Sequence, residues 1–257
     1  MRRIAVTNQK GGSGKTTTVV NLAAALGEQG QRVLIVDFDQ QANASEWLGC
    51  TDGGRDLLDA LTDNVNLVDI VRHTDVEGVS LVPSSAWLAG IERALANEPG
   101  AEMIFRNKLT KLGSKWDVCL VDCPPALGVM TISALVACDQ ILVPVEASTL
   151  ALRGLATLTE TVNKVGERLN PNLAIDAVLP CRVDRRRNLA GDVVAELRKR
   201  FGRLVLDTEI RENVRLTEAP SFTQPITTYA PTSSGAEDYR AAAAELLQRW
   251  KRRKRRR

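Results

Sequence analysis

The sequence of 257 residues lacks several features that would indicate other classes of protein. No apolar run reaches the length of about 18 residues that a transmembrane helix needs, so we expect no membrane span. The first residues enter a strand-like pattern at once, which predicts that there is no signal peptide. Aromatic residues make up only 4% of the chain, and the core must therefore consist mainly of Ala, Val, Leu and Ile.

Residues that commonly build zinc sites or nucleophile sites are also scarce. His73 is the only histidine, and we expect it in a turn or at the surface rather than in a catalytic set. The cysteines are five in number and irregularly spaced, so the sequence predicts neither a disulfide framework nor a zinc site. We expect reduced, buried thiols at Cys50, Cys119, Cys123, Cys138 and Cys181.

The overall composition is that of a globular protein, but its charge is unevenly placed. Hydrophobic residues make up 44% and charged residues 25%, which excludes a disordered chain, a collagen and a coiled-coil rod. Residues 249–257 carry eight basic side chains and no acid, and subtracting these from the net charge of +3 leaves −5 for residues 1–248. We predict one domain over 1–248 and a disordered basic tail over 249–257. That tail either binds DNA or an anionic membrane, or is solvated without a specific role.

Apolar segments typical of strands alternate with segments of helical periodicity. The strands are apolar at every residue rather than at every second one, which indicates burial on both faces. We therefore predict an α/β fold with a doubly wound, mostly parallel sheet that has helices on both faces. Residues 57–61 indicate a short helix, and residues 67–71 a short strand or turn. The remaining predicted strands are 3–8, 32–37, 79–83, 117–122, 140–145 and 173–179, and the remaining helices are 16–28, 86–97, 101–112, 131–137, 150–169, 189–201 and 239–250.

The strongest motif is a glycine-rich loop between the first strand and the first helix. It reads Gly11-Gly12-Ser13-Gly14-Lys15-Thr16. Glycines let backbone N–H groups turn toward phosphate oxygens, and the helix dipole adds positive potential. Lys15 supplies a charge to the β and γ phosphates, and the Thr16 hydroxyl suits Mg²⁺. Gln9 replaces the first glycine of the usual G-x-x-x-x-G-K-[ST] pattern, yet the strand–loop–helix context still predicts a site for ATP and Mg²⁺.

The segment VTNQKGGSGKTT resembles the deviant Walker A motif of the ParA/MinD family of P-loop ATPases. The resemblance continues through VLIVDFDQQANASEWLG and through WDVCLVDCPPALG, which is similar to the Walker B strand of the family. It extends over nearly all of residues 1–248, in the family's order, with ILVPVEASTLALRGL, VDRRRNLA and IRENVRLTEAPSFTQPI. The last two segments are most similar to small, Soj-like ParA proteins of chromosomes and plasmids.

The resemblance implies a role for individual residues. Lys10 matches the extra lysine that crosses a dimer interface to the partner's nucleotide, and Asp39 matches the aspartate required for hydrolysis, acting with Lys15. Asp37 and Asp122 end two strands and match the acids that support Mg²⁺ together with Thr16. The implied nucleotide contacts are Lys10, Gly11, Gly12, Ser13, Gly14, Lys15, Thr16, Thr17, Arg211 and Asn213.

The chain departs from the family pattern at two places. Relatives commonly show D-P-Q-G-N where this chain has Asp39-Gln40-Gln41-Ala42-Asn43, so the loop that holds Asp39 has lost a proline and a glycine. The stiffness of that loop and the rate or trigger of hydrolysis are therefore open. Arg211 stands where relatives have proline, which leaves its contact with adenine open as well.

Several arginines indicate that DNA is a partner. Arg186 and Arg215 match positions that bind DNA without sequence preference in ParA relatives, and Arg182, Arg185 and Arg187 lie near the first of them. A guanidinium suits phosphate because it is planar and always charged. Aromatic residues are not interleaved with these arginines, and no recognition-helix pattern is present, so base reading is not expected.

The resemblance implies an ATP-dependent switch in the cytoplasm, associated with the nucleoid. ATP and Mg²⁺ form a homodimer that binds DNA, and slow hydrolysis, stimulated by a ParB-like protein, releases it during chromosome or plasmid partitioning. One alternative is a MinD-like membrane-associated regulator, which we favour less because only Leu246, Leu247 and Trp250 are apolar near the basic run. A second is a ParA-type protein that positions another cargo over the nucleoid. A metabolic P-loop enzyme has no substrate-specific motif in its favour.

Overall fold

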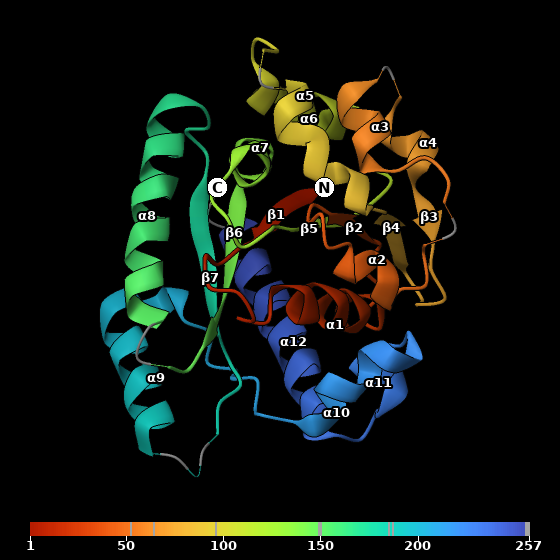
Figure 1. Ribbon diagram of the computed structural model, residues 1–257. Helices are drawn as coiled ribbons and strands as arrows, with labels where there is room; N and C mark the ends of the chain where they lie inside the picture. Colours follow the sequence, from red (N-terminus) through yellow and green to blue (C-terminus); the bar gives the residue numbers. More distant parts are fainter. Residues whose placement is uncertain are drawn as a thin grey trace.

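Seven strands form one sheet in the computed structural model, which describes every residue except 52, 64, 96, 149, 150, 185, 187 and 255–257. The strand order is β3-β4-β2-β5-β1-β6-β7, and only β3 runs antiparallel to its neighbour (Figure 1). This confirms the predicted doubly wound, mostly parallel α/β fold. The strands are β1 (Arg2–Val6), β2 (Val33–Asp37), β3 (Arg72–His73), β4 (Val79–Val82), β5 (Val118–Asp122), β6 (Gln140–Glu146) and β7 (Ala174–Cys181).

Helices cover both faces of the sheet and bury three of its inner strands along their whole length. Every residue of β2, β4 and β5 is buried, as their uninterrupted apolar sequences predict. One hydrophobic cluster joins one face to helices α3 to α9, and the other cluster joins the opposite face to α1, α2 and α10 to α12. The active edge of such a sheet is the one where the parallel strands end.

The predicted helices are all present, and one short segment was predicted wrongly. Helices also form where none was predicted, over Asn43–Trp47, Gly202–Leu204, Val214–Glu218, Ala219–Phe222 and Ile226–Tyr229. Residues Leu67–Ile70 form a helix, α4, where we predicted a strand or turn. Leu67 and Ile70 are both buried and lie three residues apart, which is the spacing of one helical face rather than of a strand. The others are α1 (Lys15–Gly27), α2 (Asn43–Trp47), α3 (Leu57–Thr62), η1 (Ala86–Gly90), α5 (Ile91–Leu95), α6 (Ala101–Thr110), α7 (Val129–Ala137), α8 (Ala151–Arg168), α9 (Asn188–Phe201), η2 (Gly202–Leu204), α10 (Val214–Glu218), η3 (Ala219–Phe222), α11 (Ile226–Tyr229) and α12 (Ser234–Lys254).

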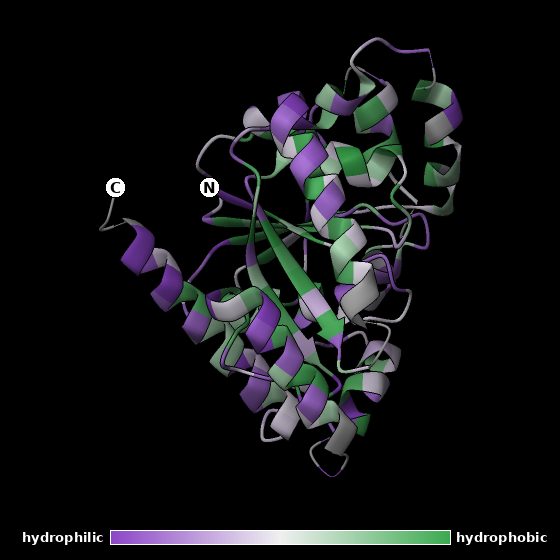
Figure 2. Ribbon diagram, turned by 90° about the vertical axis from the view of Figure 1, so that its left-hand side faces the viewer, coloured by the Kyte–Doolittle hydropathy of each residue, from purple (hydrophilic) through white to green (hydrophobic). Residues whose placement is uncertain are grey.

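The last helix corrects the predicted disordered tail. Helix α12 continues to Lys254, so residues 249–254 are helical and only 255–257 lie outside the described residues. The cause is tertiary packing, because Trp250 is buried in the second cluster and holds the chain in a helix beyond residue 248. Figure 2 shows this hydrophilic end projecting from the body beside the N-terminus.

Several side chains lie where the composition predicted them. All five cysteines are free and buried, and burial raises the pKa of Cys119 and of Cys181 to about 12, so neither thiol is reactive at neutral pH. His73 is exposed on β3. Among the described residues, no helix combines the length and the apolar character that crossing a bilayer requires.

Candidate nucleotide site

The glycine-rich loop turns sharply between β1 and α1. Gly12 and Gly14 have φ angles of +71° and +86°, a left-handed conformation that glycine adopts without the penalty of a side chain. Gly14 is the N-cap of α1, and no side chain caps that end of the helix. The loop therefore leaves the positive end of a 13-residue helix open to a ligand.

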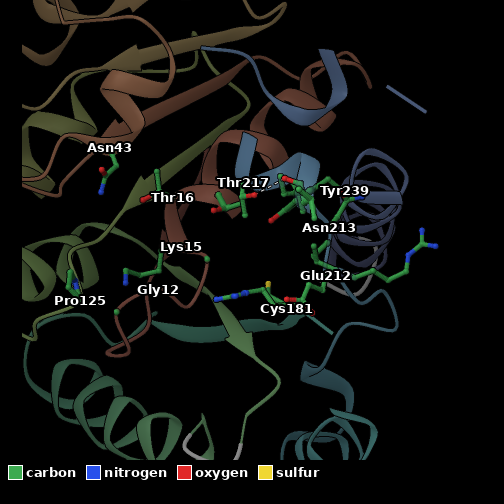
Figure 3. Close-up of a pocket in the computed structure, with 18 of the residues that line it drawn as sticks. Gly12, Lys15, Thr16, Asn43, Pro125, Cys181, Glu212, Asn213, Thr217 and Tyr239 are labelled. Atoms are coloured by element: carbon green, nitrogen blue, oxygen red, sulfur yellow. Dashed lines mark hydrogen bonds between the residues drawn. The ribbon is translucent and has the colours of Figure 1, made fainter. Parts of the chain in front are cut away.

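A cavity of about 520 Å³ lies in front of this loop, a volume within the range of small-molecule and cofactor sites. Figure 3 shows Gly12, Lys15 and Thr16 on one side of it, with Asn213, Thr217 and Tyr239 on the other. Its walls thus come from the first helix, the segment after β7 and the last helix. The lining residues include Gly11, Gly14, Thr17, Asp39, Gln41, Asn43, Pro125, Cys181, Arg182, Ile210, Arg211, Glu212, Val214 and Leu216.

Lys15 is a buried cation in this cavity. Burial lowers the pKa of its ammonium, while the carboxylates of Asp122 and Asp39 act against that shift. Its Nζ donates a hydrogen bond of 3.4 Å to the backbone carbonyl of Lys10, at the long end of the hydrogen-bond range. A desolvated ammonium with such weak partners gains most from an incoming phosphate.

Two strand-ending carboxylates lie side by side because β2 and β5 pair in register, with Asp37 opposite Asp122. Both carboxylate oxygens of Asp37 accept hydrogen bonds from the protein. One oxygen accepts from the backbone N–H of Ser45 at 2.9 Å and from its hydroxyl at 2.7 Å, and the other accepts from the N–H of Asp39 at 3.2 Å. Burial raises the pKa of Asp37 to about 6 despite these bonds.

Asp122 differs from Asp37 because neither of its buried carboxylate oxygens has a hydrogen-bond partner of good geometry. Burial raises the pKa of Asp122 well above its usual range and Asp37 adds to this, while the Thr16 hydroxyl and Lys15 act in the opposite direction. Hard oxygen atoms with unfilled coordination are the donors that Mg²⁺ prefers. The residues present therefore fit Mg²⁺, with Asp122 and Thr16 as the free donors and Asp37 held back by Ser45.

Asp39 follows the end of β2 at the same edge of the sheet and lines the cavity. Its side chain accepts from the N–H of Gln41 at 3.0 Å, and its backbone carbonyl accepts from the Ser84 hydroxyl at 2.9 Å. Ala42, which stands where relatives have glycine, has a φ of +51°. A non-glycine residue there costs about 1 kcal/mol, so the departure from the family pattern strains the loop that holds Asp39.

Lys10 is held within its own chain. Its ammonium contacts the carboxylate of Glu146 and donates to the Ser148 hydroxyl at 3.2 Å. Its backbone N–H donates to the side chain of Asn8 at 3.1 Å, and Asn8 in turn donates to the carbonyl of Pro144 at 2.7 Å. Sequence reasoning missed Glu146, although its place at the carboxyl end of β6 marks the same edge of the sheet.

Arg211 and Asn213 both line the cavity, but their polar atoms bind the protein. Asn213 accepts from the N–H of Arg215 at 2.8 Å, which caps α10, and donates to the Ser234 hydroxyl at 2.7 Å. The guanidinium of Arg211 pairs with Asp238 at 2.7 Å and Glu237 at 3.0 Å, and its backbone N–H donates to Asp238 at 2.8 Å. Arg211 therefore clamps this wall of the cavity to α12, a role that its place in the sequence did not reveal.

Loosening the clamp should weaken nucleotide binding. We expect Arg211→Met to raise the Kd for ATP about tenfold, because the loop that ends at Asn213 loses the ion pair that attaches its side chain to α12. Asp238→Asn should act similarly, and the double variant should be no worse than either single one. Titration with a fluorescent ATP analogue measures all three, with Glu237→Gln as the control, since that carboxylate is mostly exposed. Additive effects in the double variant would contradict the clamp.

The predicted DNA-contacting arginines lie outside the cavity and are accessible. The Arg186 side chain is 87% exposed and pairs with Asp184 at 2.9 Å, and the exposed Arg215 pairs with Glu218 at 2.9 Å. The two segments that carry them are neighbours, because Val183 forms a bridge with Arg211. The predicted neighbours Arg185 and Arg187 lie outside the described residues.

Comparisons with known proteins agree with this geometry. A family model described as an AAA domain matches residues 1–175. Sporulation initiation inhibitor protein Soj of Bacillus subtilis is 43% identical over 245 residues, covering 95% of this chain and 97% of that protein. Chromosome partitioning protein ParA of Myxococcus xanthus is 39% identical over 250 residues, covering 96% and 88%. A solved structure from Mycobacterium smegmatis, described as cobyrinic acid a,c-diamide synthase with bound ATP analogue and magnesium, is 36% identical with a TM-score of 0.85, covering 98% and 96%.

Proposed function

The chain belongs to the ParA/MinD family of P-loop ATPases, and from this membership we propose that it is an ATP-dependent dimerising switch for chromosome or plasmid partitioning. The observation that carries the proposal is the cavity lined by the phosphate loop and the buried Lys15, whose ammonium interacts with the unpartnered, fully buried carboxylate of Asp122. Relatives named for partitioning, Soj and ParA among them, support the biological role.

We assign the binding of ATP to the loop and its flanking groups. Backbone N–H groups of residues 11–17 hold the phosphates, and Lys15 donates to the β and γ phosphates. Thr16 and Asp122 hold Mg²⁺, which supplies positive charge against the phosphate oxygens when bound. Arg211 and Asn213 form the wall on the side of the base. Binding of the phosphates repays the desolvation of Lys15.

We assign hydrolysis to Asp39 acting on water. Its carboxylate keeps an oxygen for a water molecule while the N–H of Gln41 fixes the other one. The strained loop around Ala42 makes that position sensitive to its surroundings, which suits an ATPase that is slow until a ParB-like partner completes the site. Lys10 reaches the nucleotide of a second copy once it leaves Glu146, so ATP joins two protomers across their carboxyl edges.

The dimer then binds DNA without sequence preference, in the cytoplasm at the nucleoid. Arg186 and Arg215 supply the contacts, and pairing two protomers doubles a modest basic surface. Hydrolysis separates the protomers and weakens the hold on DNA.

DNA retention with ATP, with ADP and without nucleotide tests the switch. We expect ATP to raise the affinity for a duplex of random sequence at least tenfold, and Arg186→Glu or Arg215→Glu to remove most of that gain while leaving the ATP affinity unchanged. Filter binding or biolayer interferometry measures it. Lys164→Glu on α8 is the matched control, because Lys164 is also an exposed cation. Equal retention in all three nucleotide states would exclude the switch.

A further inference from the structure

The end of α12 forms a basic surface at the edge of the sheet that lies opposite the nucleotide cavity. Lys251, Arg252 and Arg253 are exposed there, and Arg2 lies beside them at the start of β1. We call these four residues the C-terminal basic face. Figure 2 shows the hydrophilic end of α12 standing out from the body, close to the N-terminus.

A buried acid fixes this face in place. Asp176 of β7 is 3% exposed and accepts from the indole N–H of Trp250 at 3.0 Å and from the Gln140 amide at 3.1 Å. Arg253 also pairs with Asp176. The guanidinium of Arg2 lies 5.0 Å from the centre of the Trp250 ring and donates to the backbone carbonyl of Trp250 at 3.3 Å. The basic end of the helix is therefore positioned by the body of the protein.

The same packing leaves the face polar. Leu246 and Trp250, two of the three apolar residues near the basic run, are 2% and 3% exposed and belong to the hydrophobic core. Leu247 is partly buried against that core. Binding in a membrane interface requires an apolar stripe that enters the acyl region. At this end of α12 the apolar residues are instead packed in or against the hydrophobic core of the protein. Its charge therefore fits the phosphates of a nucleic acid better than a bilayer.

The location separates this face from the nucleotide. Strand β1 begins at Arg2 and leads to the phosphate loop at its other end, and β7 carries Asp176 near its start and ends at Cys181, before Arg186. Lys10, Asp39 and Arg186 all follow the carboxyl ends of strands. A dimer joined through those ends leaves the C-terminal basic face outside the seam, so the face is accessible both in the ATP-bound dimer and in the separate protomer.

We propose that the C-terminal basic face is a second DNA-binding surface that contacts phosphates whether or not ATP is bound. This inference goes beyond the switch and does not depend on it. The Arg186 surface gives an ATP-dependent gain, whereas the C-terminal basic face gives a constant hold that keeps released protomers near DNA. Because the contacts are made with phosphates, they are independent of sequence and weaken with salt.

The double variant Lys251→Gln with Arg252→Gln tests this surface in the full-length protein. Without nucleotide, we expect its affinity for a random-sequence duplex to fall roughly threefold to tenfold at low salt, and the slope of log K against log salt to shrink by about 2. The gain in affinity on adding ATP should persist. The matched control is Lys164→Gln with Lys199→Gln, which removes the same charge from exposed positions of α8 and α9.

Two results would overturn the proposal. One is an unchanged nucleotide-free affinity and salt slope in the double variant. The other is binding of the wild-type protein to phosphatidylserine vesicles, but not to the duplex, through the same two residues. If ATP does not raise the DNA affinity of the wild-type protein, that result counts against the switch. It does not count against the C-terminal basic face, because this face is tested without nucleotide.

Discussion

Replacing Lys15 with Met will weaken ATP binding about 100-fold or more without destabilising the nucleotide-free protein. Lys15 is 7% exposed, and burial lowers the pKa of its ammonium because the charge is poorly solvated. Removing an incompletely paired buried cation relieves that cost, so the melting temperature of the nucleotide-free variant should equal or exceed that of the wild type. The affinity for ATP should fall about 100-fold or more, since the charge-assisted bonds to phosphate are lost.

Thermal unfolding with and without ATP and Mg²⁺ measures both effects together. The wild-type protein should gain about 2.7 kcal/mol at a ligand concentration of 100 times its Kd, while Lys15→Met, whose Kd is about 100-fold higher or more, should gain about 0.4 kcal/mol or less at the same concentration. Lys111→Met, which removes an exposed lysine after α6, should keep the full gain. A Lys15→Met protein that ATP stabilises as much as the wild type would contradict the proposed site.

The parts of this protein that sequence reasoning predicted correctly depend on short-range signals. The parallel sheet follows from strands such as β2 and β5, whose residues are apolar at every position and buried at every position. The glycine loop is local as well, because Gly12 and Gly14 need left-handed backbone and the helix begins directly after them. The proximity of Asp122 and Thr16 could be predicted because strand ends and helix starts meet at one edge of the sheet.

The partners of the site residues could not be predicted in the same way. Lys10 and Glu146 are 136 positions apart, and Arg211 and Asp238 are 27 apart, so each pair depends on how the strands and helices are arranged in space. The prediction of a disordered tail was wrong for a related reason. Its charge indicates repulsion, yet Trp250 and Arg253 reach Asp176, which lies 74 and 77 positions earlier. Long-range polar contacts leave no periodic trace in a sequence.

Lys10→Gln will prevent ATP-dependent dimerisation, and Glu146→Gln will promote it. In the single chain the Lys10 side chain is 35% exposed and lies against the Glu146 carboxylate. A lysine that crosses to the second protomer must first leave Glu146. The Glu146 carboxylate therefore competes with the second protomer's nucleotide for the Lys10 ammonium. Removing the lysine leaves two facing sets of phosphates without a cation at the seam, and we expect the dimerisation constant to fall about 100-fold or more.

Removing the competing carboxylate should change the affinity of the dimer in the opposite direction and by a smaller factor. Each Lys10–Glu146 pair is partly exposed and contributes about 1 kcal/mol at most, and a dimer breaks two of them, so Glu146→Gln should tighten the dimer by no more than about 30-fold. Sedimentation with ATP and Mg²⁺ measures both variants in an Asp39→Ala background, where ATP persists. Ser148→Ala is the control, since it removes only the hydroxyl contact of 3.2 Å. If Lys10→Gln still forms ATP-dependent dimers with unchanged affinity, no lysine crosses the seam. A tighter dimer of the Glu146→Gln protein would then need another explanation than competition for the Lys10 ammonium.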